Sequence, residues 1–237
     1  LFLEKAIIMM RIKPIKTKFS IDTTDFYFQS RKIGIGSSSA ISSALIKAIT
    51  KFFDIKLTKE IMIDSALNLH NSRQNNLGSG LDVIASSIDS GLMECDIKQA
   101  SQKKWTKLEW PSNLLIKGVI TGQQSDTNKM IEKFLKGRSD NKDFFRSLKA
   151  DADLLLKKLS DSWKAQDSES ILRLMQRYNI LMQQLDDKFD LGIYTYDHQT
   201  LANLAKKSEI FYKPSGAGGG DLGFILTNND MKFKQFI

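Results

Sequence analysis

The sequence predicts an α+β protein that is organised in two domains. A glycine-rich segment at 31–40 follows strand-like residues and precedes a helical pattern, which gives the order strand, loop, helix. After residue 122 the pattern becomes strongly helical, and a buried strand is indicated at 224–226. With 237 residues, of which 41% are hydrophobic, the chain can bury a sizeable core.

Strands and helices are both expected in the N-terminal half. Residues 1–10 are expected to form a core helix, and 16–22 with 26–28 to form a strand pair. A helix is expected from Ser37 or Ser38, with its core face at Ile41, Ala44, Leu45, Ala48 and Phe52. Another is expected from about Thr58, with Ile63, Ala66, Leu67 and His70 on one face. Short strands are expected at 91–95 and 114–121, with 98–110 as a hairpin or sheet edge.

The C-terminal half is expected to contain two packed helices. The first has one apolar face, made of Leu148, Ala152, Leu155 and Leu159. The second has an apolar face with a more regular helical repeat, at Ile171, Leu174, Met175, Tyr178, Leu181, Met182 and Leu185. We place the domain boundary near Pro111, which gives domains 1–111 and 112–237.

The bulk composition excludes several classes of protein. A single cysteine, Cys95, rules out an internal disulfide framework, and two histidines argue against a structural zinc site. The apolar stretch at 1–10 is too short to span a membrane. The net charge of +8 suits an anionic ligand, but the basic residues are dispersed, so we expect no nucleic-acid or membrane partner. We expect a cytoplasmic monomer or homodimer that acts on a small molecule.

Two glycine-rich segments carry the signal for function, one at 31–40 and one at 213–221. Glycine lets backbone N–H groups turn toward an anion, and a helix that begins at Ser37 or Ser38 adds its positive end. Both segments are therefore interpreted as phosphate cradles that converge on one site. The first segment matches neither the P-loop signature nor the dinucleotide fingerprint, because no Gly-Lys-Ser/Thr follows and position 39 is serine.

Three motifs together resemble those of the GHMP kinase superfamily. Residues 34–40 look like its Gly-Leu-Gly-Ser-Ser-Ala-Ala loop, residues 78–82 like its Gly-Ser-Gly-x-Asp element, and residues 213–223 like its C-terminal glycine loop. The resemblance covers most of the chain. It implies a two-lobed fold, with an N-terminal mixed sheet with helices and a C-terminal helix-rich α/β lobe.

Within the superfamily the chain is most similar to phosphomevalonate kinases. The similarity lies in Lys-Pro-Ser-Gly-Ala-Gly-Gly-Gly-Asp at 213–221 and in Thr121-Gly122-Gln123 followed by Ser125 and Thr127. It implies transfer of the ATP γ-phosphate to 5-phosphomevalonate, with ATP and Mg²⁺ required. Two alternatives stay open. One is another GHMP kinase with an alcohol acceptor such as mevalonate, homoserine or a sugar, and the other is a truncated nucleotide-binding member without turnover.

The resemblance also assigns roles to residues. It makes Asp82 the catalytic carboxylate. Lys32 stands just before the glycine loop, where it can neutralise negative charge that is shared between the donor and acceptor phosphates. ATP is expected at Gly34, Ile35, Gly36, Ser37, Ser38 and Ser39, with Ser38 also the Mg²⁺ ligand. The acceptor is expected at Ser79, Ser125, Thr127, Ser215, Gly216, Ala217 and Gly218, although Ser125 and Thr127 suit helix capping equally well.

Two departures from the family pattern are visible. Only 33 residues precede Gly34, so we expect the N-terminal domain to be incomplete at its start. Some members place a Mg²⁺-ligating glutamate eleven residues before the catalytic aspartate, and Asn71 stands there in this chain. The metal is then expected to depend on Ser38, on phosphate oxygens and on water.

Overall fold

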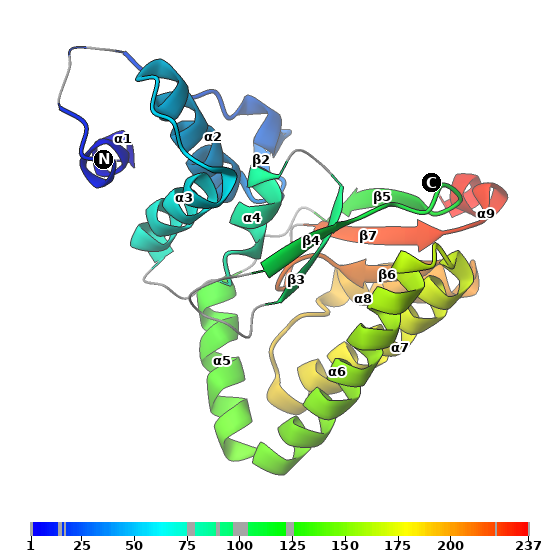
Figure 1. Cartoon of the computed structure of the whole chain (residues 1–237). Coiled ribbons are helices and arrows are strands. Elements are labelled where there is room, and N and C mark those ends of the chain that lie inside the picture. The colour runs from blue at the N-terminus through cyan, green and yellow to red at the C-terminus, as the bar shows by residue number, and fades with distance from the viewer. Residues whose placement is uncertain are drawn as a thin grey trace. The chain divides into compact units, whose positions relative to one another are not determined.

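The computed structural model describes residues 2–13, 16, 18–74, 79–88, 91–96, 104–121, 126–220 and 222–236. The chain divides into two compact units, which are described separately (Figure 1). Unit 1 comprises 1–27 and 35–106, and unit 2 comprises 28–34 and 107–237. Helices and strands occur in both, which confirms the α+β class. The domain limits 1–111 and 112–237 stay a prediction.

The described residues of unit 1 form four α-helices, α1 (Phe2–Met9), α2 (Ser37–Phe52), α3 (Lys59–Gln74) and α4 (Leu81–Ser87). Their core consists of buried apolar side chains, namely Ala6, Leu45, Ile46, Ile49, Ala66, Leu69 and Val83. A smaller cluster joins Ile63, Ile84 and Ile88 to Met93 and Trp105. These last two lie on β3 (Leu92–Asp96) and β4 (Lys104–Leu108), which pair with each other and confirm the strand expected at 91–95.

The buried face of α2 differs from the predicted one. Ala44, Ala48 and Phe52 are exposed, whereas two serines, Ser42 and Ser43, are buried. Their hydroxyls have partners, since Ser42 Oγ donates to the Ser38 carbonyl at 2.8 Å and Ser43 Oγ lies 2.8 Å from Ser87 Oγ. Small hydroxyl side chains satisfied in this way allow α2 and α4 to pack closely, which an apolar pattern alone does not predict.

The predicted strand at 16–22 is wrong, because its described residues form no strand. Asp22 instead starts a turn, in which its carboxylate accepts hydrogen bonds from the backbone N–H and the hydroxyl of Thr24. A short 3₁₀ helix (Thr24–Phe26) follows, and the ladder of β1 (Tyr27–Phe28) with β2 (Arg31–Lys32) leads to the first glycine segment. Local side-chain bonding therefore outweighs the alternation of polar and apolar residues.

Unit 2 contains an antiparallel sheet in the order β5 (Leu115–Ile120), β7 (Leu222–Thr227), β6 (Phe211–Pro214). Because β7 is central, Ile225 and Leu226 are buried, as predicted for this strand. The unit's helices are α5 (Thr127–Asp140), α6 (Lys142–Lys164), α7 (Ser168–Phe189), α8 (Tyr196–Lys207) and α9 (Asp230–Phe236). Ala205 and Ile210 pack with Tyr212 and Ile225 on one face of the sheet.

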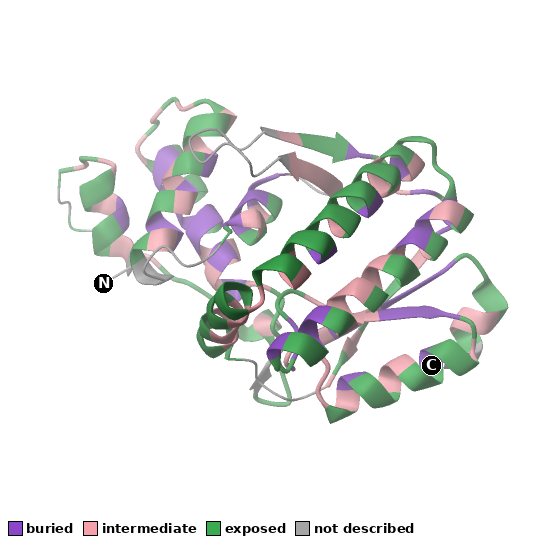
Figure 2. Ribbon diagram, turned by 90° about the horizontal axis from the view of Figure 1, so that it is seen from below, coloured by how far each residue is buried: buried purple, intermediate pink, exposed green. Residues whose placement is uncertain are grey.

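The two long helices α6 and α7 lie side by side, as their apolar patterns predict (Figure 1). Leu148 on α6 and Leu185 and Phe189 on α7 belong to one buried cluster. Figure 2 shows buried and exposed residues alternating around these helices, which is typical of helices with one face on a core. None of the described helices combines the length and apolar character that a membrane crossing requires.

Candidate functional site

The first glycine segment adopts a backbone that only glycine takes up readily. Gly34 and Gly36 have φ values of 78° and 79°, in the left-handed region. Gly36 is the N-cap of α2, so no side chain caps this helix. The first N–H groups of a helix have no partner within it, and they are oriented to bind an anion. The start of α2 therefore suits a phosphate group.

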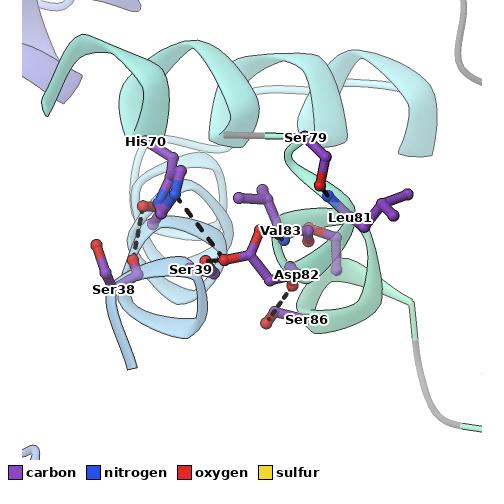
Figure 3. Close-up of polar contacts among 10 residues, drawn as sticks. Ser38, Ser39, His70, Ser79, Leu81, Asp82, Val83 and Ser86 are labelled. Atoms are coloured by element: carbon purple, nitrogen blue, oxygen red, sulfur yellow. Dashed lines mark hydrogen bonds and ion pairs between the residues drawn. The ribbon is translucent and has the colours of Figure 1, made fainter. Parts of the chain in front are cut away.

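Asp82 lies beside this helix start, in the first turn of α4. A Cβ placed at Gly36 would stand 4.0 Å from Asp82 Cβ. The Ser39 hydroxyl donates to Asp82 Oδ2, and the backbone N–H of Val83 donates to Oδ1 at 3.0 Å (Figure 3). Ser39 is fully buried, whereas the Asp82 side chain is 50% exposed. The carboxylate is thus fixed on its buried side and open on the other.

His70 on α3 contributes a buried ring to the same group. Its Nε2 lies 3.9 Å from Asp82 Oδ2, which is too long for a hydrogen bond, and its side chain is 2% exposed. Its Nδ1 is buried and has no hydrogen-bond partner among the described residues. The same holds for Oδ1 of Asn71. Both are polar atoms that a bound ligand or water could satisfy.

The predicted ATP residues do not all face the same way. Figure 3 shows the Ser38 side chain directed away from Asp82 and the Ser39 side chain directed toward it. Ser37 is buried, Ser38 is half-buried and Ile35 is exposed. Ser39 was expected to bind ATP, but its hydroxyl is engaged with the carboxylate of Asp82.

The remaining predicted residues are spread over both units. Ser79 is exposed, and its hydroxyl lies 3.5 Å from the backbone nitrogen of Leu81. Lys32 is on β2 in unit 2, and Ser125 lies outside the described residues. Thr127 is the exposed first residue of α5, and the cap of that helix is Asp126, which accepts from the N–H of Lys129 at 3.1 Å. Thr127 is therefore not the capping residue of this helix.

The second glycine segment is a tight loop between β6 and β7. Its four left-handed glycines are Gly216, Gly218, Gly219 and Gly220, with φ values of 57°, 80°, 79° and 146°. The loop is closed by two backbone bonds, from Ser215 N to Leu222 O at 2.9 Å and from Gly218 N to Ser215 O at 3.0 Å. This brings the predicted acceptor residues 215–218 together in one turn. Residues 35–40 of the first glycine segment belong to unit 1 and the second segment belongs to unit 2, so their convergence stays a prediction.

The segment after α7 supports this loop from one side. The N–H of Gly219 donates to the carbonyl of Ile193 at 2.9 Å, and a Cβ at Gly218 would lie 2.6 Å from Ile193 Cγ2. The backbone there is held in turn by Asp186. Its buried carboxylate accepts three N–H bonds, from Gly192 at 2.7 Å, Ile193 at 2.9 Å and Tyr194 at 2.8 Å.

Lys213 lies at the start of the same loop, on β6. Its Nζ is 5.3 Å from the ring centroid of Phe224, and the residue is half-buried. Burial lowers the pKa of Lys213 to about 8. The side chain is therefore not a solvated surface lysine.

Sequence reasoning missed Asp186 and also His198, a buried residue of α8 whose Nε2 lies 3.1 Å from the carbonyl oxygen of Gly220. The sequence contains a signal for each of these two residues. Asp186 is a carboxylate within the apolar stripe of α7, where an unpaired charge would be costly. His198 is one of only two histidines in the chain, and both are buried.

Comparison with known proteins agrees with these motifs. Residues 10–89 match the family described as GHMP kinases N terminal domain. Phosphomevalonate kinase from Streptomyces sp. (strain CL190) is 25% identical over an alignment of 221 residues, which covers 84% of this chain and 58% of that enzyme. This chain thus spans little more than half the length of that relative.

Two solved structures share the fold. One is phosphomevalonate kinase from Streptococcus pneumoniae in complex with phosphomevalonate and AMPPNP, with a TM-score of 0.76 at 17% identity over 99% of this chain and 75% of that one. The other is L. major mevalonate kinase in complex with R-mevalonate, with a TM-score of 0.71 at 18% identity over 85% of this chain and 59% of that one. The resemblance of the chain to the GHMP kinase superfamily is thus confirmed by the match of residues 10–89 to the N-terminal domain of that family and by the similarity to phosphomevalonate kinase.

Proposed function

We propose that this chain has phosphomevalonate kinase activity, which transfers the γ-phosphate of ATP to 5-phosphomevalonate and releases diphosphomevalonate and ADP. The observation that carries the proposal is the position of Asp82. Its carboxylate is held by Ser39 next to the uncapped start of α2, and half of its side chain is open to solvent. A fixed carboxylate beside an anion-binding helix start is what a phosphoryl-transfer site requires.

The choice of acceptor depends on the second glycine loop. Its glycines carry no side chain that would block a phosphate, and Gly216 and Ala217 at the tip of the loop are exposed, as suits an anionic phosphate. The motif at 213–221 is similar to that of phosphomevalonate kinases, and the Streptococcus pneumoniae structure of the same fold contains phosphomevalonate. The residues proposed to hold the acceptor are Ser79, Ser125, Thr127, Ser215, Gly216, Ala217 and Gly218.

The proposed reaction is one displacement at phosphorus. An oxygen of the acceptor phosphate forms a bond to the γ-phosphorus, and the bond from that phosphorus to the bridging oxygen of ADP breaks. The acceptor oxygen is already ionised near neutral pH, so Asp82 orients the acceptor and needs to remove no proton. The ammonium of Lys32 offsets negative charge that is shared between donor and acceptor.

The residues of unit 1 fit ATP with Mg²⁺. Ser38 presents a half-buried hydroxyl in the first turn of α2, and Asn71 has a buried amide oxygen without a partner among the described residues. Both are hard oxygen donors of the kind that Mg²⁺ accepts, and the described residues contain no group of three His, Cys, Asp or Glu side chains that could hold a metal. The bound metal would neutralise phosphate charge, with phosphates and water as its other ligands.

The proposal is tested by ADP release with Mg²⁺-ATP and a panel of acceptors. We expect release with 5-phosphomevalonate, a loss of about 100-fold or more in Asp82→Asn, and a comparable loss in Lys32→Ala. Asp64→Asn and Lys51→Ala are matched controls, because each removes the same charge from an exposed position in unit 1. Release with mevalonate but not with its phosphate would overturn the choice of acceptor.

The main alternative is a kinase with an alcohol acceptor. It is favoured by the fold shared with the mevalonate kinase structure and by the half-exposed carboxylate of Asp82, which could take a proton from a hydroxyl group. Homoserine, mevalonate and sugars in the acceptor panel distinguish a kinase with an alcohol acceptor from a phosphomevalonate kinase. A nucleotide-binding protein without turnover is distinguished by calorimetry, as ATP binding without ADP release on any acceptor.

A further inference from the structure

The second histidine of the chain connects α8 to the C-terminal glycine loop. His198 is fully buried, with 0% of its surface exposed. Its Nε2 lies 3.1 Å from the carbonyl oxygen of Gly220, and its Nδ1 lies 2.6 Å from Oη of Tyr212 on β6. A single ring therefore joins the last glycine of the loop to the strand that leads into it.

The chemistry of the two partners fixes the protons. A carbonyl oxygen only accepts, so Nε2 of His198 carries a proton and donates to Gly220. In the neutral ring Nδ1 then accepts from the Tyr212 hydroxyl. Burial, together with the nearby negative charge of Asp197, raises the pKa of Tyr212 well above its usual range, so the hydroxyl stays protonated and can donate. Hydrogen bonding runs from Tyr212 through His198 to Gly220.

The strand on the other side of the loop leaves space for this arrangement. A Cβ placed at Gly223 on β7 would stand 2.2 Å from Oη of Tyr212. A side chain at Gly223 would therefore displace the hydroxyl that orients His198. This accounts for a glycine inside a strand, where its conformational freedom is otherwise a cost.

We propose that His198 is a positioning residue, which holds the C-terminal glycine loop in the form that binds the acceptor phosphate, and that Tyr212 sets the tautomer that allows it to do so. The identity of the ligand rests on the proposed function. A loop with four left-handed glycines has many backbone states when it is not held. A loop ordered before the ligand arrives binds that ligand more tightly, because the ordering no longer opposes binding.

The kinetic test is the variant Tyr212→Phe, which keeps the ring and removes only the hydroxyl. We expect the KM for 5-phosphomevalonate to rise by about 3- to 10-fold, the loss expected for one net hydrogen bond, and the KM for ATP to stay unchanged. His198→Gln, whose amide N–H can replace the Nε2 donor, is expected to bind the acceptor more tightly than His198→Asn. Tyr178→Phe is the control, since Tyr178 is a half-buried tyrosine of α7 in the same unit.

Nuclear magnetic resonance tests the proposal without catalysis. In the wild-type protein we expect the neutral Nε2–H form of His198, and loop amides that shift on titration with 5-phosphomevalonate alone. Tyr212→Phe is expected to need about 3- to 10-fold more ligand for the same shift. If these results appear without ADP release, the proposed function fails and the positioning role stands. An Nδ1–H form of His198, loop amides that do not respond, or equal titrations and equal acceptor KM values in wild type and variant would each overturn the positioning role.

Discussion

The hydroxyl of Ser39 donates a hydrogen bond to the carboxylate of Asp82, joining the first turn of α2 to the first turn of α4. Ser39 is fully buried, so water does not compete for this bond from its side. The orientation of the carboxylate therefore depends on Ser39, whereas the side chain of the neighbouring Ser38 is directed away from Asp82. Two neighbouring serines of α2 thus direct their side chains to different sides of the helix start, one toward Asp82 and one away from it.

Replacing Ser39 with alanine should release Asp82. We expect kcat to fall by about 10- to 100-fold, because a small misplacement of a reacting group is costly, while the KM for ATP changes little. Steady-state kinetics on both substrates measure this. Ser43→Ala is the matched control, since it removes another buried hydroxyl of α2 that bonds to Ser86 and Ser87 instead. A large rise in the KM for ATP with unchanged kcat would return Ser39 to the predicted role of ATP ligand.

Two glycines of the C-terminal loop should respond differently to alanine. Both have left-handed backbones, so each substitution is expected to cost about 1 to 2 kcal/mol in unfolding free energy. A Cβ at Gly216 meets no described atom within 4 Å, whereas one at Gly218 meets Ile193 at 2.6 Å. Gly218→Ala should therefore lose clearly more stability and acceptor binding than Gly216→Ala in denaturant melts and titrations. Equal effects would contradict the packing of the loop against Ile193.

Asp186 should matter to the loop without touching any ligand. Asp186→Asn replaces a carboxylate that accepts three backbone N–H groups with an amide that can accept through one atom only. We expect a loss of roughly 2 kcal/mol in unfolding free energy and faster amide exchange at 192–194 and 219. Asp187→Asn, at the exposed neighbouring position, provides the control. Unchanged exchange at Gly219 would show that the loop is held by other contacts.

The lowered pKa of Lys213 predicts a dependence of stability on pH. The folded state holds this amine neutral above about pH 8, whereas the unfolded chain keeps it protonated to about pH 10, so the unfolded state binds more protons between these values. Stability should therefore rise through this window. The buried tyrosines have raised pKa values and act in the opposite direction above about pH 10, so the useful range is about pH 8 to 9.5.

The contribution of Lys213 is isolated by comparing wild type with Lys213→Met. Denaturant melts across this pH range should show the rise in the wild-type protein and its absence in the variant. Lys207→Met, at an exposed position of α8, should keep the wild-type slope. Identical slopes in all three proteins would mean that Lys213 is charged and solvated in the folded state.

The fold was predictable where one force dominates. The regular apolar stripes of α6 and α7 and the short apolar run of β7 were recognised because burial of apolar surface alone decides them. The strand at 16–22 was predicted wrongly, since the carboxylate of Asp22 forms a turn with Thr24 that a count of alternating residues ignores. The face of α2 was predicted only in part, because buried serines pack there through hydroxyl bonds.

The candidate site likewise contains some residues that the sequence reveals and others that only the folded chain reveals. Glycine segments and Asp82 are visible in a sequence because their spacing is local and the residue types are restricted. Asp186 and His198 act on backbone atoms that are distant in sequence or presented by a turn, and only the folded chain brings these atoms within hydrogen-bonding distance. The sequence predicts Ser39 as one of several serines in the first glycine segment, but which serine faces the carboxylate depends on how α2 packs against α4.

The most direct test of the central proposal is phosphorus-31 resonance of Mg²⁺-ATP and 5-phosphomevalonate incubated with the protein. We predict that the acceptor phosphate resonance is replaced by the paired resonances of a diphosphate ester while ATP converts to ADP in equal amount, and that Asp82→Asn prevents both changes but Asp64→Asn does not. An unchanged acceptor resonance, with ATP either intact or hydrolysed to inorganic phosphate, would contradict the proposal.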